Sequence, residues 1–179
     1  MLSQFSQEIP GQITLADIDF PFEKDVYPVG RLDADSEGLL LLTNDKSLNF
    51  KVLDPKNEHS RTYYVQVEGD ISDEAIAKLC EGVEITIHGK KHITQKAKVE
   101  KLAEIPLFPP RNPPIRFRQH IPTSWVSITL TEGKNRQVRR MTAAVGFPTL
   151  RLVRVQMGKV KLGDLQPEEV REVVKSSIL

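Results

Sequence analysis

The 179-residue sequence predicts an α+β protein, with a mixed, largely antiparallel sheet flanked by helices. Strand-like segments outnumber helical ones, and the two kinds do not alternate as repeated strand–helix–strand units. With hydrophobic residues at 39% and charged residues at 27%, a chain of this length buries about 70% of its unfolded surface on folding. We therefore expect a single domain over residues 1–179 that needs no disulfide or metal for stability.

Two strands are predicted before residue 70. Residues 38–43 contain four consecutive leucines, which is typical of a buried strand. In residues 63–67, Tyr63, Val65 and Val67 occupy alternate positions, which indicates a half-buried strand with these side chains on one face. Because successive side chains of a strand point to opposite faces, Tyr64 is expected on the other side.

A helix is predicted to begin at Ser72 and to stop at Gly82. Ser72 is a favourable N-cap, acidic residues follow it in the first turn, and Gly82 permits a positive φ at the C-terminal end. The expected apolar face consists of Ile76, Leu79, Cys80 and Val83. Cys80 is interpreted as a core thiol, and a single cysteine excludes a disulfide framework and suits a reducing cytoplasm.

A hairpin is predicted from residues 83–87 and 91–99, turning at residues 88–90, where Gly89 supplies a positive φ. The following stretch, 106–122, contains six prolines. Because proline is excluded from helix interiors and central strands, this stretch is expected to be a long ordered loop or a loose hairpin.

The last third of the chain predicts two strands and two helices. Residues 126–130 alternate apolar and hydroxyl side chains, and residues 150–155 are rich in β-formers, so both are expected to be strands. Between them, a helix is predicted from an Asn135 N-cap to a stop at Gly146. Its expected apolar side consists of Val138, Met141, Thr142 and Val145. Residues 167–174 are predicted to form a short final helix.

Charge is distributed very unevenly along the chain. From Arg111 to Lys161 there are 11 basic residues and one acid, Glu132, which gives +10, whereas the remainder carries 14 basic and 23 acidic residues, which gives −9. Such a basic block predicts a polyanionic partner such as nucleic acid. The alternative is that the basic segment contacts the acidic part of the same fold. No secretory signal or long apolar run is present, so we expect a cytoplasmic protein that does not enter a membrane.

The carboxylates Asp33, Asp35 and Glu37 have the spacing of a calcium loop, but the twelfth position is Asn44 instead of a bidentate glutamate. Cysteines and histidines are too few or too poorly spaced for zinc, and no glycine-rich phosphate or dinucleotide loop is present. A magnesium site would need a second acidic cluster to complete an octahedron, and none stands out, so no metal and no cofactor are expected. In an extended segment, Arg31 and Asp33 project to the same side and can share a cleft, although an ordinary surface ion pair is the alternative.

Three motifs in order carry a resemblance to a known family. Residues 30–45 (GRLDADSEGLLLLTND) closely resemble the catalytic motif of the RsuA-like family of ribosomal RNA pseudouridine synthases. Residues 61–65 (RTYYV) are similar to the family's second motif, and residues 132–141 (EGKNRQVRRM) to its third. The resemblance extends from the first residues to about Val173. The proline-rich stretch is most similar to that of a subgroup that modifies large-subunit RNA.

The resemblance implies the pseudouridine synthase catalytic fold and the isomerisation of a uridine in 23S ribosomal RNA without cofactor or metal. It implies that Asp33 is the catalytic carboxylate, acting as nucleophile or base, that Tyr63 packs against the target uracil and can move a proton, and that Arg139 pairs with Asp33. A strand aromatic in the core is the alternative for Tyr63. Arg31 is expected to stack in the space that the extruded base vacates.

Basic residues of the motifs and of the proline-rich stretch are the expected RNA contacts, with Phe117 as a ring that can stack on a base. They are Arg31, Arg61, Arg111, Arg116, Arg118, Lys134, Arg136 and Arg140. Cations near the start of a helix are disfavoured by the helix dipole, which favours an anionic partner there. The alternative is that arginine is simply a good helix former.

Two departures from the family pattern are visible. The family's opening strand and its small N-terminal RNA-binding domain do not precede Leu2, and Arg61 stands where relatives often have lysine. The main alternative function is a non-catalytic RNA-binding or ribosome-assembly module, and a more distant one is a metal-dependent nuclease that uses Asp33, Asp35 and Glu37. We expect a monomer whose partner is large-subunit ribosomal RNA.

Overall fold

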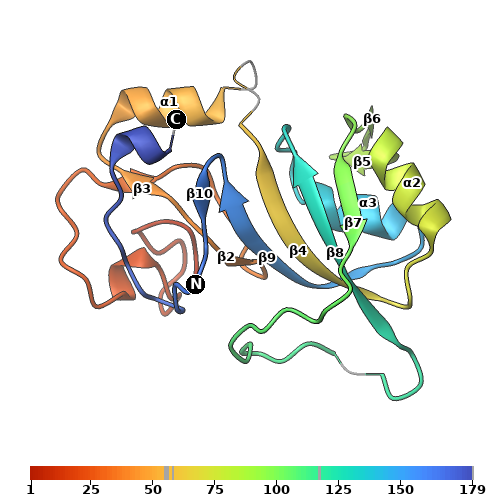
Figure 1. Cartoon of the computed structure of the whole chain (residues 1–179). Helices are drawn as coiled ribbons and strands as arrows, with labels where there is room; N and C mark the ends of the chain where they lie inside the picture. The colour runs from red at the N-terminus through yellow and green to blue at the C-terminus, as the bar shows by residue number, and fades with distance from the viewer. Residues whose placement is uncertain (55–56, 58, 117, 179) are drawn as a thin grey trace.

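A six-stranded sheet forms the centre of the computed structural model, which describes residues 1–54, 57, 59–116 and 118–178 (Figure 1). Five strands lie in the order β10–β9–β4–β8–β7, each antiparallel to its neighbour. A short strand, β2 (Glu37–Gly38), joins β9 in parallel. The other strands are β4 (Arg61–Glu68), β7 (Lys98–Lys101), β8 (Thr123–Leu130), β9 (Thr149–Met157) and β10 (Val160–Lys161). The predicted fold class is confirmed.

Two helices, α2 (Asp73–Glu81) and α3 (Gln137–Ala144), pack on one face of this sheet (Figure 1). The start of α2 follows the prediction, because Ser72 Oγ accepts a hydrogen bond from Ala75 N at 3.2 Å. The end of α2 also follows the prediction, since Gly82 comes directly after the helix with φ +100°. The apolar core between helices and sheet includes Val65, Val67, Leu79, Val126, Ile128, Met141 and Leu152.

Cys80 lies partly buried against this core, and its Sγ is 3.7 Å from the carbonyl oxygen of Val99. Cys80 thus serves as a small apolar residue of α2 that packs against the core, as predicted. Within the described residues, no helix is both long and apolar enough to cross a membrane.

The opposite face of the sheet contacts the proline-rich loop, of which residues 102–116 and 118–122 are described and which extends below the sheet in Figure 1. Phe108 of this loop lies between two rings of the sheet, with centroid distances of 6.3 Å to Tyr64 and 5.9 Å to Trp125. Tyr64 therefore faces away from the helices, as the alternation of β4 predicts. Its described residues form a loop, as the prolines predict.

The predicted hairpin is tighter than expected and its second arm is shorter. Strands β5 (Glu84–Ile87) and β6 (Lys90–Ile93) pair across a two-residue turn in which His88 and Gly89 have φ +48° and +77°. Two residues with positive φ match the twist of a hairpin. The chain then leaves β6 near the buried Thr94, whose Oγ1 accepts a hydrogen bond from Val83 N at 2.9 Å, and continues into β7.

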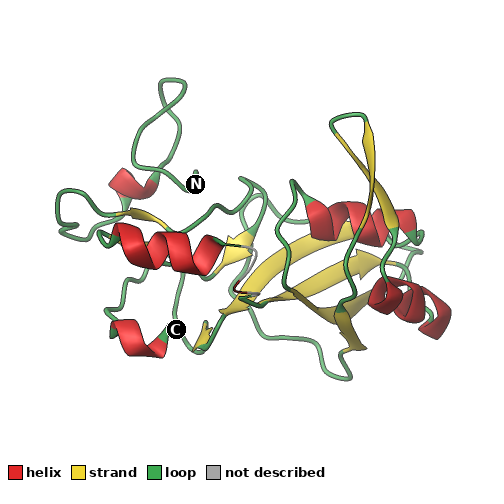
Figure 2. Ribbon diagram, turned by 90° about the horizontal axis from the view of Figure 1, so that it is seen from above, coloured by secondary structure: helices red, strands yellow, loops and turns green. Residues whose placement is uncertain are grey.

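A second lobe contains the chain termini and its own small core (Figure 2). It comprises η1 (Leu15–Asp17), β1 (Tyr27–Pro28), β3 (Leu42–Thr43), α1 (Lys46–Leu53) and η3 (Lys175–Ser177). The core consists of Val29, Leu39, Leu41, Leu48, Val52, Met157 and Ile178. β9 links the two lobes, because Leu152 belongs to the first core and Met157 to the second.

The predicted strand over residues 38–43 is wrong as a single element. Its ends belong to different sheets: β2 pairs with β9, and β3 pairs with β1. Leu39 and Leu41 are buried in the core of the second lobe, so the leucine run crosses from one sheet to the other. Its hydrophobicity correctly indicates burial, but burial of this kind does not require a strand.

Helix α1 was not predicted, and the predicted helix over residues 167–174 does not form. Asp45 caps α1 by accepting hydrogen bonds from the amides of Ser47 and Leu48. The helix shows little periodicity because Phe50, an apolar residue, is 71% exposed. Residues 167–174 lack a buried face, and Glu168 has φ +66°, which interrupts any helix.

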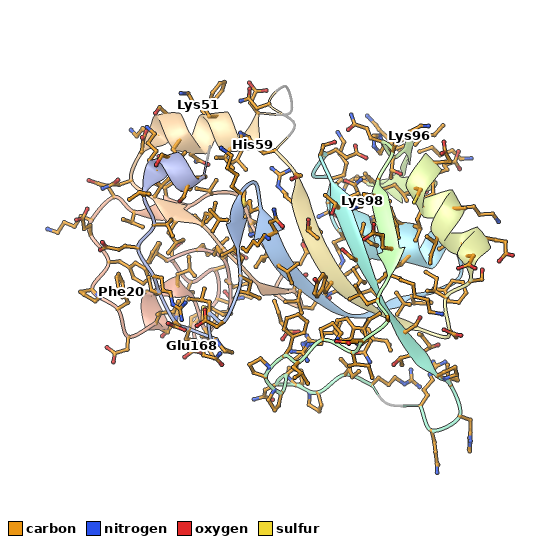
Figure 3. All side chains as sticks on the ribbon, in the orientation of Figure 1. Phe20, Lys51, His59, Lys96, Lys98 and Glu168 are labelled. Atoms are coloured by element: carbon orange, nitrogen blue, oxygen red, sulfur yellow. The ribbon has the colours of Figure 1, made fainter. Side chains whose placement is uncertain are left out.

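The free edge of the sheet at β7 carries charged side chains. Lys96 and Lys98 lie on this side of the molecule (Figure 3), with ion pairs to Glu81 at 2.9 Å and to Glu100 at 3.1 Å. Exposed charges along an edge strand oppose edge-to-edge association with another sheet.

Candidate active site

Asp33 lies in a loop (residues 29–36) between β1 and β2, and contacts at both ends hold this loop. At one end, Ser3 Oγ accepts a hydrogen bond from Leu32 N at 3.0 Å and donates one to Leu32 O at 3.1 Å. At the other end, Ser36 N donates to Asp33 O at 2.8 Å, which closes a turn. The Asp33 carboxylate is 32% exposed and accepts no hydrogen bond from any described residue.

Arg136, at the start of α3, contacts both carboxylates of this loop. Its guanidinium donates two hydrogen bonds to the Asp35 carboxylate, at 3.0 and 2.9 Å, and its Nη1 lies 3.7 Å from Asp33 Oδ2. The hydrogen bond from Arg136 is the main reason that the pKa of Asp35 lies below its ordinary value. The same bond raises the pKa of Arg136. Arg136 therefore links the Asp33 loop to α3.

The expected ion pair between Arg139 and Asp33 is wrong in its partner. Arg139 Nη2 donates to the backbone carbonyl of Asp35 at 2.7 Å, and its Nε lies 3.5 Å from Asp35 Oδ2. The turn after Asp33 presents this carbonyl to the helix, and Arg139 binds it from a position where its side chain is 12% exposed. Burial lowers the pKa of Arg139, which the charges of Asp35 and Asp33 oppose.

The start of α3 also differs from the prediction. Asn135 is not the N-cap; Arg136 occupies that position with φ +49° and no side-chain cap bond. Asn135 is engaged elsewhere, since its backbone oxygen and Oδ1 accept hydrogen bonds from Arg140 at 3.1 and 3.2 Å. Arg140 also donates to the Thr86 carbonyl at 2.6 Å. A left-handed arginine persists only where its surroundings hold it, and the Asp35 pair does so here.

Tyr63 lies on the helix-covered face of β4, where it is half-buried and packs against the core. Its cross-strand partners are Ile128 on β8 and Arg154 on β9. β9 also holds the end of the Asp33 loop, because Leu39 N donates to Arg154 O at 2.8 Å and Arg154 Nε donates to Leu39 O at 2.7 Å. The sheet position of Tyr63 and the seat of the Asp33 loop are thus fixed by the same strand.

Glu37 connects the Asp33 loop to the proline-rich loop. Arg151 binds both Glu37 oxygens, at 2.9 and 2.7 Å, donates to the Pro109 carbonyl at 2.8 Å, and lies 5.5 Å from the centroid of the Phe108 ring. Arg111 lies 3.7 Å from Glu37 Oε2. Arg151 and Arg154 were not predicted as site residues, although two arginines within the largely apolar β9 are a signal that could have identified them.

Some of the expected RNA contacts are engaged within the protein. Arg61 donates to the carbonyls of Val52 and His59, at 3.4 Å each, and Arg118 pairs with Glu68 at 3.0 Å. Arg61 therefore joins β4 to the end of α1. Within the described residues, five arginines of the basic segment contact acids outside it: Arg111, Arg118, Arg136, Arg139 and Arg151. The alternative, that the basic segment contacts the acidic part of the same fold, thus accounts for much of the charge asymmetry.

Three expected RNA contacts remain open to solvent. Arg31, Arg116 and Lys134 are exposed, and none of their side chains forms an ion pair or hydrogen bond with a described residue. Arg31 therefore does not pair with Asp33, two residues away. Phe117, expected to stack on RNA, lies outside the described residues.

The acids of the first motif do not gather around a common point. Each acid faces an arginine: Asp33 and Asp35 face Arg136, and Glu37 faces Arg151. Among the described residues, no group of three or more histidine, cysteine, aspartate or glutamate side chains is placed to hold a metal ion.

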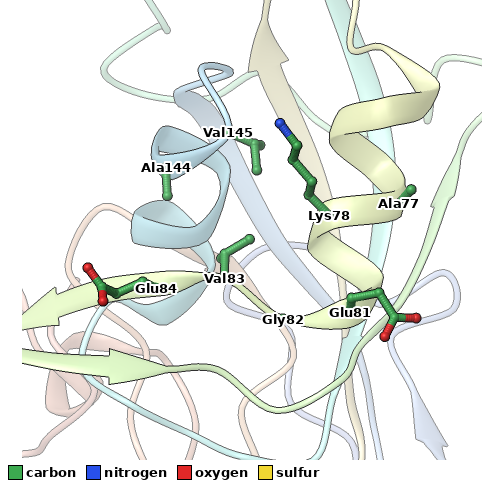
Figure 4. Close-up of a pocket in the computed structure, with 8 residues that line it drawn as sticks. All are labelled: Ala77, Lys78, Glu81, Gly82, Val83, Glu84, Ala144 and Val145. Carbon is green, nitrogen blue, oxygen red and sulfur yellow. The ribbon is translucent and has the colours of Figure 1, made fainter.

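A hollow of about 600 Å³ lies away from Asp33, between the C-terminal ends of α2 and α3 (Figure 4). It is lined by Ala77, Lys78, Glu81, Gly82, Val83, Glu84, Ala144 and Val145. It contains none of the motif residues, so the Asp33 loop and not this hollow is the candidate active site.

Comparison with known proteins defines the class. The sequence profile of the family described as RNA pseudouridylate synthase matches residues 13–144. A crystal structure of a pseudouridylate synthase superposes with a TM-score of 0.73 at 29% identity, over 92% of this chain and 64% of that chain. The fold is therefore that of a pseudouridine synthase, which confirms the expected fold.

Curated proteins of the same class are closely similar in sequence. The chain is 53% identical over 172 residues to ribosomal large subunit pseudouridine synthase E of Vibrio parahaemolyticus, covering 96% of this chain and 69% of that protein. It is 48% identical to the protein of the same name from Xanthomonas campestris, covering 96% and 89%. The chain belongs to the RNA pseudouridylate synthase family of enzymes. The resemblance on which the sequence analysis relied is thereby confirmed.

Proposed function

We propose that this chain isomerises a uridine of large-subunit ribosomal RNA to pseudouridine, with Asp33 as the catalytic carboxylate and without cofactor or metal. The substrate class is supported by the names of relatives that are 53% and 48% identical to it. The proposal places the protein in the cytoplasm, as a monomer.

One observation carries the assignment of Asp33. Asp35 and Glu37 are each bound by an arginine through two hydrogen bonds, whereas Asp33 has only an ion-pair contact at 3.7 Å. Its carboxylate oxygens are thus the ones of this motif that are free to meet a substrate. The surrounding contacts hold the loop while leaving this group open, which is what a preorganised catalytic side chain requires.

The reaction needs little more than such a carboxylate. The bond between C1′ of the ribose and N1 of uracil breaks, the base turns, and C5 bonds to C1′; C5 loses its proton and N1 gains one. Nothing is oxidised, reduced or added. Asp33 serves as nucleophile or base in this sequence. Tyr63 packs against the uracil, and Arg139 positions the Asp33 turn through the Asp35 carbonyl.

RNA binding is assigned first to the exposed cations. Arg31, Arg116 and Lys134 have no protein partner among the described residues and are free for phosphates or bases. Arg31 is two residues from Asp33, where its planar guanidinium can stack in the space left by an extruded base. Arg61, Arg111, Arg118, Arg136 and Arg140 contribute through positions that protein contacts already fix.

The test is tritium release from RNA that carries tritium at uracil C5, because pseudouridine formation removes that hydrogen. We expect release by the wild type and none by Asp33→Asn, with RNA affinity unchanged within about tenfold since phosphate contacts dominate binding. Asp164→Asn, at an exposed carboxylate that pairs with Arg171, is the matched control and should release tritium normally.

Two other results would point to the alternative functions. Tight RNA binding without release by the wild type would support a non-catalytic RNA-binding module. RNA cleavage that EDTA abolishes would support a metal-dependent nuclease, whereas the synthase should be indifferent to EDTA on prefolded RNA.

A further inference from the structure

Arg154 is a buried arginine on β9, opposite Tyr63 and bonded to Leu39 at the end of the Asp33 loop. Arg154 is 2% exposed. On β9 it lies directly across from Tyr63 on β4, and the two strands lie side by side in Figure 1. Directly opposite residues of an antiparallel pair project to the same face, with Cβ atoms about 4.5–5.5 Å apart. The Arg154 side chain therefore lies next to that of Tyr63.

The hydrogen bonds of this guanidinium are incomplete. Nε donates to the Leu39 carbonyl at 2.7 Å, whereas Nη2 is fully buried and has no hydrogen-bond partner in the described structure. No carboxylate of a described residue forms an ion pair with it. A buried cation with neither a counter-charge nor a full set of acceptors is costly, so its presence in this strand calls for a specific neighbour.

That neighbour is Tyr63. Burial lowers the pKa of Arg154, and the Tyr63 phenol is the group that opposes this, while Arg61 acts in the same direction as burial. Among the neighbours that act on this pKa, Tyr63 is the one that favours the charged guanidinium, and Nη2 has no hydrogen-bond partner among the described residues. Because Tyr63 and Arg154 are cross-strand partners on the same face of the sheet, the phenol oxygen is a candidate acceptor for the unused Nη2 donor.

We infer that Arg154 is a positioning residue for Tyr63: its buried cation holds the phenol in place and strengthens the hydrogen bond that the phenol offers to the target base. This inference rests on the proposed function of the Asp33 site. The physical basis is a donor chain, from guanidinium to phenol oxygen and from phenol hydroxyl to a uracil oxygen, in which each bond polarises the next inside a low-dielectric site. The uracil gains negative charge when its bond to C1′ breaks, so such a donor acts where charge develops.

Arg154 also has a second contact, the hydrogen bond to Leu39 that seats β2 on the sheet. Substitutions must separate the two. Arg154→Lys keeps a buried cation but loses the planar Nε donor, whereas Arg154→Gln loses the charge. We expect Arg154→Gln to lower kcat for tritium release by about 30-fold with KM unchanged within about threefold, and Arg154→Lys to recover most of that loss.

The decisive comparison repeats both substitutions in a Tyr63→Phe protein, which lacks the phenol oxygen. If Arg154 acts through Tyr63, Arg154→Gln costs no more than about twofold further in this background. An equal fold-loss in both backgrounds, or equal loss from the lysine and glutamine variants, would show that Arg154 only supports the fold, and the inference would be wrong. Arg171→Gln, which removes an exposed arginine bound to Asp164 and Glu169, is the control for nonspecific loss of charge.

A measurement without RNA keeps this inference separate from the proposed function. The ring Cζ resonance of Tyr63, labelled with carbon-13 and assigned by its disappearance in Tyr63→Phe, reports the electrostatic surroundings of the phenol. It should shift in Arg154→Gln and return towards the wild-type position in Arg154→Lys. An unmoved resonance would refute the contact, whereas absence of tritium release by the wild type would refute the proposed function and leave this resonance to decide the role of Arg154.

Discussion

Replacement of Gly38 by alanine tests how the Asp33 loop is attached to the sheet. Gly38 has φ +99°, and a Cβ at this position would lie 2.3 Å from the carbonyl oxygen and 2.7 Å from the nitrogen of Arg154. Both are backbone atoms of β9, so no side chain can move aside to relieve the clash. Gly146 is a matched control: its φ is +90°, but nothing lies within 4 Å of its Cβ position.

The expected cost follows from these two geometries. A left-handed φ costs a residue with a Cβ about 1–2 kcal/mol, and both variants carry this cost. In Gly38→Ala, β2 must also separate from β9, which disrupts the bonds between Leu39 and Arg154, at 2.8 and 2.7 Å. At about 1 kcal/mol each, these bonds raise the expected loss to about 3–4 kcal/mol, against about 1–2 kcal/mol for Gly146→Ala.

Urea unfolding followed by circular dichroism measures both values, provided that the m-values agree. Because β2 begins four residues after Asp33, the folded Gly38→Ala protein should also release tritium more slowly, by about 100-fold, since a displacement of 1 Å in a catalytic group has this order of effect. Gly146→Ala should be near wild type in turnover. Equal destabilisation of the two variants would refute the claim that close contact with β9 seats the Asp33 loop.

Three further predictions concern other contacts. Arg136→Gln removes the hydrogen bond that lowers the pKa of Asp35. This pair stabilises the fold fully above the ordinary pKa of 3.8 and loses its effect as pH falls through the lower folded-state pKa, so the stability deficit of the variant in urea should shrink in acid. A deficit that does not change with pH would contradict this. Arg151→Gln should release the proline-rich loop and hasten its cleavage in limited proteolysis, and Glu37→Gln should have the same effect. The double variant should be cleaved no faster than either single variant, whereas additive effects would show that the two side chains act separately. Ser72→Ala removes the N-cap of α2 and should cost about 1 kcal/mol in urea unfolding while turnover stays at the wild-type value; lost turnover would mean that α2 does more than support the sheet.

Several elements could be predicted because their causes are local. The alternation of β4 and β8, the Ser72 cap of α2 and the prolines of residues 102–122 each act over a few residues. Where local signals were weak or misleading, the prediction failed. The exposed apolar residues of α1 concealed its periodicity, and residues 167–174 had helix-forming residues but no surface against which a helix could pack.

By itself, the sequence determined the α+β class, most of the central sheet and the motif residues that identify the family. The tertiary structure decided which arginine meets which acid. Asp35 and Arg136 are 101 residues apart, and their bidentate contact exists because the turn after Asp33 and the left-handed start of α3 meet across the sheet. The same applies to Arg154 beside Tyr63, which depends on the register of β4 and β9. Ion-pair and cross-strand partners depend on the relative positions of distant segments, which local periodicity does not specify.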